Sequence, residues 1–430
     1  MVDNSLKMMH PKDQIIMIID RIYKKGFTTT SGGNLSVMDE NGDMWVTPSG
    51  VDKGSLRSSD IMCVKSGGEI TGDHKPSMEY PFHKAIYENR PDIRAVVHAH
   101  PPALVAFSIV REMPDTNLIP GIKEVCGVPG YAKYHLPGSE NLGTSISEQF
   151  KAGFYSVIME NHGAVVGGSD LLDAYERFET LEFLCRSIVN SRIIGEPSSL
   201  SEKQLLAYKK YRVPSLPEME TVFYPPKEKE IRKEICKFLQ RAYHQNLIMS
   251  SFGSVSVRWE DDDFLITPGQ GARWNITPED IVQIKRGECE PQKIACKSYL
   301  LHQKIYERFP HINCVILARP DNLMAYSISH KTLDVRTIPE SWIFLQDMEN
   351  VPFDSCINGE DIIVSKISKE KPGVIVENDS VLMTGSSLLK AFDRLEVAEF
   401  SAKSLIMGTS LGRFEPMNNT QIEELRKAFF

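Results

Sequence analysis

The stretch "HKAIYENRPDIRAVVHAHPPALVAFSI", residues 83–109, decides the fold of this 430-residue chain, because it returns as "HQKIYERFPHINCVILARPDNLMAYSI" at residues 302–328. Further segments recur in the same order in both halves of the chain. They are "SGGNLSV" at 31–37 with "SFGSVSV" at 251–257, "MWVTPSG" at 44–50 with "FLITPGQ" at 264–270, and "SDLLDAYERFETLEF" ending at Phe183 with "SSLLKAFDRLEVAEF" ending at Phe400. Chance does not preserve the order and spacing of so many segments, so the two halves are two copies of one domain.

Each copy begins with an amphipathic helix and continues with alternating strands and helices. Residues 11–25 and 230–244 carry apolar side chains at helical spacing, and short β-branched runs such as 94–97 alternate with helical patterns such as 171–188. This alternation predicts an α/β layered domain in which helices cover a central sheet. The pattern does not set the order or the direction of the strands.

A Pro-rich polar stretch, residues 211–227, lies between the two copies and is typical of a linker. We therefore expect one domain over residues 1–215 and a second over residues 222–430. Each is close to the size of about 200 residues that a chain of this length predicts for two domains.

The composition narrows the class of partner. A net charge of −8 disfavours nucleic acid or an anionic membrane as a partner, although a local site can still bind a small anion. No apolar run approaches the roughly 20 residues that span a bilayer, and the first residues lack the apolar core of a signal peptide. The 8 cysteines lie singly, without a C-x-x-C pair, which predicts reduced thiols in a cytoplasmic protein.

Three histidines of the first copy have the spacing of metal ligands. The run "VVHAHPP" places His98 and His100 two residues apart at the end of a predicted strand, so both rings point to the same face. His162 follows a second apolar run in "VIMENHG", where Gly163 permits a tight turn. A lone histidine at a strand end is usually an ordinary polar residue, but three neutral imidazoles with an open position are typical of catalytic zinc.

Glu79 lies in "KPSMEYPFH", at the start of the helix that precedes the His98 strand. A carboxylate in the first turn of a helix is usually only a favourable partner of the helix dipole. Next to a metal, however, it can act as a ligand and can also move a proton. Ser77 is the expected cap of this helix, whose free N–H groups can bind an anion.

Two loops rich in small residues complete the candidate site. In one, Ser31, Gly33 and Asn34 lie together, and in the other Ser49 and Gly50 follow Thr47 and Pro48. Small residues let backbone N–H groups approach an anion, and hydroxyl groups add donors. Turns that merely connect strands have a similar composition, so neither loop alone identifies a phosphate site.

Taken together, "SGGNLSV", "TPSG", "PSMEYPFH", "VVHAHP" and "ENHG" resemble the class II aldolase/adducin family, whose best-known type is L-fuculose-1-phosphate aldolase. The resemblance implies two tandem class II aldolase-like α/β domains. It implies a divalent ion, zinc in most of the aldolases, on His98, His100 and His162, with Glu79 as the acid/base. The residues implied to bind the substrate phosphate are Ser31, Gly33, Asn34, Ser49, Gly50 and Ser77.

Two departures from the aldolase pattern bear on the reaction. Met78 replaces a serine, which removes one hydroxyl group from the phosphate site. In "PGIKE", Glu124 replaces the tyrosine that protonates the aldehyde oxygen in the aldolases, and a carboxylate there is closer to the epimerases. Glu124 is therefore a second candidate catalytic residue. Four tyrosines are alternative proton donors, and the sequence does not select among Tyr131, Tyr134, Tyr208 and Tyr211.

The second copy has lost the candidate metal ligands. The repeat places Leu317 at the position of His98, Arg319 at that of His100 and Asp379 at that of His162. Ser298 replaces Glu79, and Ser254 replaces Asn34. An arginine at a ligand position repels a cation, so the second domain is expected to bind no metal and to be non-catalytic.

The resemblance, together with the intact ligands of the first copy, implies a metal-dependent lyase with one divalent ion, zinc, per chain. It would cleave a phosphorylated sugar, such as a ketose 1-phosphate, to dihydroxyacetone phosphate and an aldehyde. A pentulose-phosphate 4-epimerase or a decarboxylase would use the same site, and an adducin-like scaffold would need no metal. Because aldolase sites of this family lie between subunits, the second copy is expected to serve as a neighbour in a dimer of tandem chains that forms a pseudo-tetramer.

Overall fold

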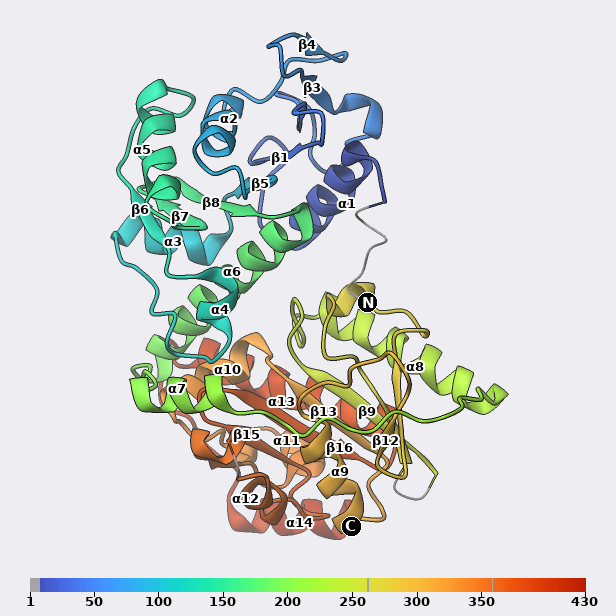
Figure 1. Ribbon diagram of the computed structural model, residues 1–430. Coiled ribbons are helices and arrows are strands. Elements are labelled where there is room, and N and C mark those ends of the chain that lie inside the picture. The colour runs from blue at the N-terminus through green and yellow to red at the C-terminus, as the bar shows by residue number, and fades with distance from the viewer. Residues whose placement is uncertain (1–7, 261–262, 358) are drawn as a thin grey trace. The chain divides into compact units, whose positions relative to one another are not determined.

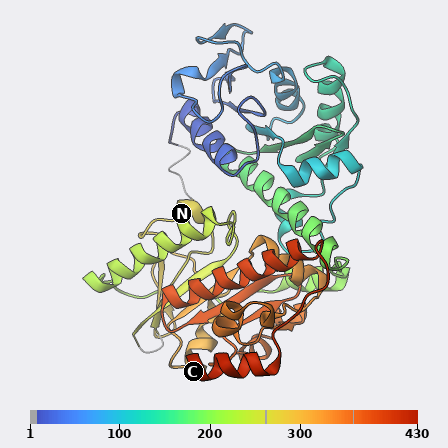
Figure 2. The same cartoon turned by 180° about the vertical axis from the view of Figure 1, so that it is seen from behind.

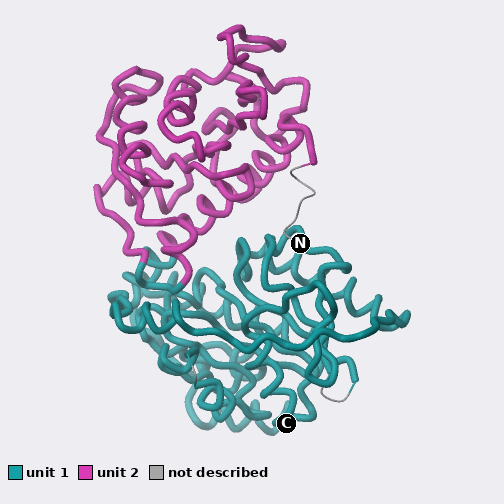
Figure 3. Tube along the Cα trace, in the orientation of Figure 1, with its two compact units in different colours: residues 1–2, 117–120, 187–430 teal, residues 3–116, 121–186 magenta. Residues whose placement is uncertain are grey.

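The computed structural model describes residues 8–260, 263–357 and 359–430. The chain forms two compact units (Figure 3). Of the described residues, one unit contains 8–116 together with 121–186, and the other contains 117–120 and those from 187 to 430. The short segment 117–120 of the first copy therefore belongs to the unit of the second copy. The expected domain bounds, residues 1–215 and 222–430, remain a prediction about the repeat.

The first unit is built around an eight-stranded sheet (Figure 1) with the strand order β4-β3-β2-β1-β5-β8-β7-β6. Neighbouring strands run antiparallel except for the β6–β7 pair, which is parallel. The strands are β1 (Asn34–Met38), β2 (Met44–Val46), β3 (Met62–Val64), β4 (Ile70–Thr71), β5 (Ala95–Ala99), β6 (Gly130–Ala132), β7 (Ser156–Met159) and β8 (Gly163–Gly168). The helices are α1 (Pro11–Lys24), α2 (Tyr80–Asn89), α3 (Pro102–Val110), α4 (Ile122–Cys126), α5 (Glu140–Lys151) and the first part of α6 (Leu171–Ile194), with a 3-10 turn at Ser58–Asp60.

The second unit repeats this sheet in the order β12-β11-β10-β9-β13-β16-β15-β14, again with a single parallel pair, β14–β15. Its strands are β9 (Ser254–Glu260), β10 (Asp263–Ile266), β11 (Val282–Lys285), β12 (Glu288–Cys289), β13 (Cys314–Ala318), β14 (Glu349–Val351), β15 (Gly373–Val376) and β16 (Ser380–Gly385). Its helices are α7 (Glu202–Lys210), α8 (Pro226–His244), α9 (Tyr299–Arg308), α10 (Asp321–Ser329), α11 (Pro339–Leu345), α12 (Glu360–Ser365), α13 (Leu388–Gly408) and α14 (Asn419–Phe429), with 3-10 turns at Arg273–Asn275, Val335–Thr337 and Phe353–Cys356. The predicted α/β class and the tandem duplication are confirmed.

The period of two along each strand divides the core into two layers. On β13, Cys314 and Ile316 pack with α8, α10 and α13, whereas Val315 packs with α9 and α12 on the other face. Figure 2 shows α8 and α13 lying across the same side of this sheet. Both faces of the sheet are therefore covered by helices, as the mixture of apolar strands and amphipathic helices requires.

The opening helix of the first copy ends where the sequence predicts. Helix α1 buries Ile15, Ile18 and Ile22 on one face, and its chain reverses at Gly26. Gly26 has φ of +70°, a conformation that glycine adopts without a steric penalty.

The predicted linker is not a free tether. The backbone N–H of Met219 donates to the carbonyl of Cys289 at 2.9 Å, and the N–H of Cys289 donates to Pro217 at 2.7 Å. Helix α8 begins at Pro226, inside the predicted stretch, because proline fits the first turn of a helix. The stretch 211–227 thus joins the copies while extending the edge of the second sheet. No helix in the described part of the chain is long and apolar enough to cross a membrane.

Candidate metal centre

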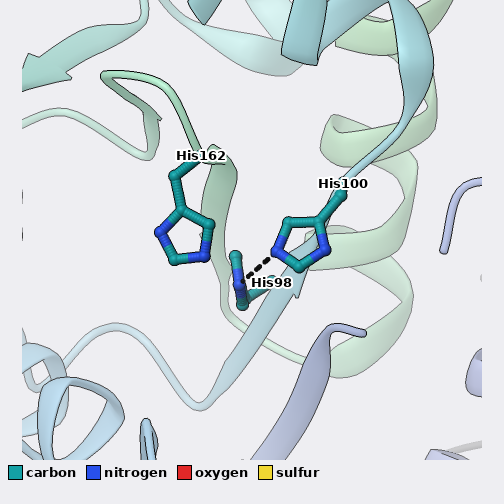
Figure 4. A group of neighbouring side chains, drawn as sticks. All are labelled: His98, His100 and His162. Atoms are coloured by element: carbon teal, nitrogen blue, oxygen red, sulfur yellow. Dashed lines mark hydrogen bonds between the residues drawn. The ribbon is translucent and has the colours of Figure 1, made fainter. Parts of the chain in front are cut away.

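Three histidine rings of the first unit converge on one point (Figure 4). Strand β5 carries His98, His100 follows it directly, and His162 lies in the turn between β7 and β8. Their potential ligand atoms all lie within 4.8 Å of one another. Strand β8 pairs antiparallel with β5, with Ala99 opposite Ala164, so the turn that carries His162 lies beside the end of β5. The predicted convergence of the three histidines is therefore present in the fold.

The orientation of His98 is set by the sheet. Its side chain is fully buried, and its Nδ1 lies 2.9 Å from the carbonyl oxygen of Ala164. Because a carbonyl only accepts, Nδ1 donates to it, and Nε2 is the ring atom that faces the rest of the cluster. That Nε2 lies 3.2 Å from Nε2 of His100. Two ring nitrogens aimed at each other in a buried site suit a shared cation.

Burial keeps the other two rings neutral. Burial, reinforced by the nearby His98, lowers the pKa of His100 to about 3 and that of His162 to about 4. Burial also opposes charge on His98, but the carboxylate of Glu79 outweighs it and raises the pKa of His98. Neutral imidazoles are the form that binds a metal, so His100 and His162 are prepared as ligands at neutral pH.

Glu79 lies against this cluster. Its Oε2 accepts a hydrogen bond of 2.8 Å from Nδ2 of Asn34 and lies 3.2 Å from Nε2 of His98. Its Oε1 is buried, lies 3.6 Å from Nε2 of His162 and makes no hydrogen bond with any described residue. Burial raises the pKa of Glu79, but the charge of His98 and the hydrogen bonds from His98 and Asn34 together hold it well below its usual value. A buried, ionised oxygen without a hydrogen-bond donor fits a site that holds a cation.

A hydrogen-bonded chain behind Glu79 was missed in the sequence. Nε2 of His83 lies 2.5 Å from Oδ1 of Asn34, and Nδ1 of His83 lies 2.7 Å from the hydroxyl of Ser36. The hydroxyl of Tyr87 lies 2.6 Å from Ser36. Since the amide oxygen of Asn34 only accepts, His83 donates to it and accepts from Ser36. The chain therefore fixes the Asn34 amide with its NH₂ group toward Glu79.

This chain also explains why His83 is not a ligand. The ring is fully buried, and burial lowers its pKa to about 3. The second copy keeps the same arrangement, with His302 between Ser254 and Ser256 and with Tyr306 beyond Ser256. The recurrence of His, Tyr and Ser in both copies was the signal in the sequence that could have revealed it.

The first candidate phosphate loop packs directly on the histidine segment. Gly33 has φ of +68°, and a Cβ there would lie 2.8 Å from the carbonyl oxygen of His98. A Cβ on Gly32 would lie 3.0 Å from Nδ1 of His100. Asn34 pairs with His98 across β1 and β5. Ser31 is exposed at the start of this loop. Two glycines thus allow the loop to approach the histidine cluster as closely as it does.

The second candidate loop lies beside the start of α2. The N–H of Ser77 donates to Thr47 at 3.1 Å, and the N–H of Ser49 donates to Lys75 at 2.8 Å. Ser77 is buried, Ser49 is half-buried and Gly50 is exposed. The prediction that Ser77 caps α2 is wrong, because the helix begins at Tyr80 and Glu79 is its N-cap residue. The N–H of Tyr80 donates to the carbonyl of Ser77 and closes a turn there, so the helix begins after this turn.

The buried side chain and backbone of Lys53 connect the second loop to the first through hydrogen bonds. Lys53 is only 3% exposed, its Nζ donates to Pro48 at 2.7 Å, and its backbone N–H donates to Thr30 at 2.9 Å. Burial lowers the pKa of Lys53 to about 8. Arg273 of the second copy is buried in the same place and donates to Gly253 at 2.9 Å. Sequence reasoning missed this cation, although its recurrence after "TP" in both copies was visible.

The candidate proton donors are not brought together. Glu124 is exposed on α4, and within the described chain no hydrogen bond or ion pair joins it to the histidines. Tyr131 is half-buried on β6 of the first unit, and the side chain of Tyr134 is 57% exposed beyond it. Tyr208 and Tyr211 belong to the other compact unit, where the hydroxyl of Tyr211 donates to Glu360.

In the second copy a charge pair occupies the position of the ligands. Arg319 donates through Nε to the backbone of Asp379 at 2.7 Å and through Nη2 to its carboxylate at 3.1 Å. The guanidinium also lies 4.4 Å from the ring centre of Phe252 and donates to the carbonyl of Pro120 at 3.3 Å. Among the described residues, His98, His100 and His162 form the single cluster with the spacing of a metal site.

Comparison with known proteins identifies the family. The sequence model of the class II aldolase and adducin N-terminal domain matches residues 13–189 and again residues 233–406. The chain therefore belongs to the class II aldolase/adducin family, as two tandem copies of its domain. A 3-oxo-tetronate 4-phosphate decarboxylase of Haemophilus influenzae is 33% identical over 175 residues, which cover 40% of this chain and 83% of the relative.

Two further relatives carry aldolase names. An L-fuculose phosphate aldolase of Methanococcus maripaludis is 33% identical over 174 residues, covering 39% of this chain and 91% of the relative. A solved structure named L-fuculose 1-phosphate aldolase is 28% identical to this chain and has a TM-score of 0.42. The match covers 46% of this chain and 92% of the solved chain. The named relatives of this family are lyases, both aldolases and decarboxylases, and the chain has the fold of these enzymes.

Proposed function

We propose that the first copy is a metal-dependent lyase that cleaves a carbon–carbon bond of a phosphorylated sugar. The observation that supports this most directly is the convergence of His98, His100 and His162 around the unsatisfied oxygen of Glu79. The three imidazoles would hold one divalent ion, zinc by the preference of a site with three histidines for that metal. When bound, such an ion supplies a Lewis acid that polarises a substrate carbonyl.

The residues of the chain account for the remaining tasks. Glu79 lies 3.2 Å from His98 and its pKa is lowered, which supports the proposal that this carboxylate moves a proton at the carbon next to the carbonyl. Asn34, held by His83, keeps that carboxylate in one orientation. The loop residues proposed to hold the phosphate through hydroxyl and N–H groups are Ser31, Gly33, Asn34, Ser49, Gly50 and Ser77. The cation of Lys53 beneath the second loop adds a positive charge.

Aldol cleavage of a ketose 1-phosphate is the reaction that this set supports best. The two products would be dihydroxyacetone phosphate and an aldehyde. Glu124 is proposed as a second acid/base group, which in the cleavage direction would take the proton of the hydroxyl group that becomes the aldehyde oxygen. Glu124 is exposed on α4, so this proton acceptor is not fixed against the histidines.

Decarboxylation of a sugar-acid phosphate is the second candidate, and two observations favour it. A relative with 33% identity is named a 3-oxo-tetronate 4-phosphate decarboxylase. Loss of carbon dioxide forms no aldehyde and so needs no base at a substrate hydroxyl group, which agrees with the exposed Glu124. A pentulose-phosphate 4-epimerase would use the same residues without changing the mass of its substrate.

One experiment separates these candidates. Purified protein is first analysed for metal: about one ion per chain supports an enzyme, about two contradicts the loss of the second site, and none supports an adducin-like scaffold. The enzyme is then incubated with a panel of ketose 1-phosphates, 3-oxo-tetronate 4-phosphate and ribulose 5-phosphate. Mass spectrometry distinguishes cleavage, loss of carbon dioxide and unchanged mass. Unchanged substrates throughout the panel would contradict a lyase of phosphorylated sugars.

The second copy is proposed to fill alternate positions in a dimer of tandem chains, which would form a pseudo-tetramer. Two copies of one domain in a chain supply the neighbouring surfaces that a ring of four domains requires. Mass photometry measures the assembly directly. A stable monomer with full activity would contradict the proposal.

A further inference from the structure

The second copy contains a cavity at the position that the metal centre occupies in the first. The cavity measures about 110 Å³, and Ser298, Leu317 and Asp379 line it. The pairing of the strands supports this equivalence, because Ser254 pairs with Leu317 as Asn34 pairs with His98. The replacement of the histidines therefore left a space in the second unit.

A tail helix of the first copy closes one side of this space. Tyr208 on α7 and Tyr211 directly after it both line the cavity. The hydroxyl of Tyr211 donates to Glu360, another lining residue. Burial raises the pKa of Tyr208, and nearby Asp379 adds to the shift, so its phenol stays protonated as a donor.

The cavity offers hydrogen-bonding groups that the protein does not use. Ser355 is 1% exposed, lines the cavity, and its hydroxyl has no hydrogen-bond partner among the described residues. A buried hydroxyl without a partner costs about 1 to 3 kcal/mol, so such groups usually have one. Four aliphatic side chains also line the cavity, namely Leu301, Leu317, Ile363 and Val376.

The two carboxylates that line the cavity are already compensated, and Lys297, the cation among the lining residues, is exposed to solvent. The carboxylate of Asp379 is held by Arg319 at 3.1 Å and by the hydroxyl of Ser380 at 2.6 Å. Glu360 lies 3.7 Å from Lys304 and accepts from Tyr211. An anion would face both carboxylates, and a cation would compete with Arg319, so the lining favours an uncharged ligand.

We propose that this cavity binds an uncharged, hydroxylated compound of about three carbons. A cavity of about 150 Å³ accommodates benzene, and the smaller space here suits a ligand no larger than benzene. One hydroxyl or carbonyl group of the ligand accepts from Ser355 and Tyr208, and another hydroxyl donates to Asp379. The inference does not depend on which reaction the first copy catalyses.

Dihydroxyacetone is the probe, and saturation-transfer NMR on the full chain measures its binding. A His98→Ala/His100→Ala variant removes the first centre as a source of signal and is expected to bind as the unchanged protein does. Leu317→Phe fills the cavity and is expected to weaken binding at least about tenfold. Leu389→Phe makes the same change on the exposed face of α13, where the side chain is 56% exposed, and is expected to have no effect.

A second variant covers the case in which Leu317→Phe does not fold. Ser355→Ala removes only the unpaired hydroxyl and is expected to weaken the affinity about fivefold. Glycerol should bind like dihydroxyacetone, and lactate, which is anionic and of similar size, should not. The proposal would be overturned if dihydroxyacetone did not bind to the unchanged protein or did not bind to the histidine variant. It would also be overturned if both cavity variants bound dihydroxyacetone as tightly as the unchanged protein does, or if lactate bound as tightly as dihydroxyacetone.

Discussion

Replacing Lys53 by methionine tests whether the two loops of the first copy form a phosphate site. Burial lowers the pKa of Lys53 from 10.5 to about 8, and each pKa unit corresponds to 1.36 kcal/mol. Holding this lysine charged at neutral pH therefore costs the fold on the order of 3 kcal/mol. Methionine has a similar shape and no charge, so Lys53→Met should not destabilise the protein and is expected to stabilise it by up to about that amount.

The affinity for phosphate should fall in the Lys53→Met variant, although its stability is expected to rise. A cation facing an anion is worth about 1 kcal/mol in water and about 4 near a protein surface. Lys53→Met is therefore expected to weaken the affinity for inorganic phosphate at least about fivefold. Lys53→Arg is the matched control, because Arg273 stands at this position in the second copy, and it should keep most of the affinity.

The pH dependence gives an independent check. With a depressed native pKa, the unfolded chain binds the extra proton between pH 8 and 10.5, so this residue makes the protein more stable as the pH rises through that range. The difference in unfolding free energy between Lys53→Met and the unchanged protein should be largest below pH 8 and vanish above about pH 10.5. Urea titrations give the stability and calorimetry gives the phosphate affinity. A destabilised Lys53→Met variant with unchanged phosphate affinity would refute both parts of the reasoning.

Three further predictions follow from named contacts. Glu79→Gln should abolish turnover in the substrate panel while bound metal, measured by mass spectrometry, stays near one ion per chain; retained activity contradicts its role as acid/base. Gly33→Ala should cost more than about 1 kcal/mol in urea unfolding, because φ is +68° and the added Cβ meets the His98 carbonyl at 2.8 Å; a neutral effect contradicts the close packing. Burial raises the pKa of Glu399 to about 8, so the unchanged protein should lose stability from pH 4.5 to 8, whereas Glu399→Gln should lose less; parallel melting-temperature curves contradict the shift.

The sequence predicted those features that a local pattern or the repeat determines. The i and i+2 spacing of His98 and His100 on a strand is enough to put both rings on one face, and the glycine after His162 marks the turn that brings in the third. The repeat made the loss of the second site visible by position alone. The order of the strands, with β1 joined to β5 and β5 to β8, could not be predicted, because those pairings depend on contacts distant in sequence.

Long-range contacts also explain what was missed. A lysine in a polar loop is usually solvated, and only the fold shows that this one is buried, with its Nζ bonded to Pro48 and its backbone N–H bonded to Thr30. Segment 117–120 belongs to the second unit because Asn378 donates to Leu118 at 2.9 Å and Arg319 to Pro120 at 3.3 Å. Nothing in the local sequence of this segment indicates such partners.

Comparison of the two copies shows which buried polar residues both sheets share and which belong to the candidate active site alone. The second copy keeps the buried histidine with its serine and tyrosine, at Ser256, His302 and Tyr306, although Glu79 and the metal ligands are gone. A group retained where the candidate metal ligands are replaced can be explained by the sheet itself, since its buried polar atoms need partners. The first copy adds one hydrogen bond to this shared network. Asn34 in place of Ser254 extends the same hydrogen-bonded chain to the carboxylate of Glu79. The Asn34 amide is thus the point at which a structural network becomes part of the candidate active site.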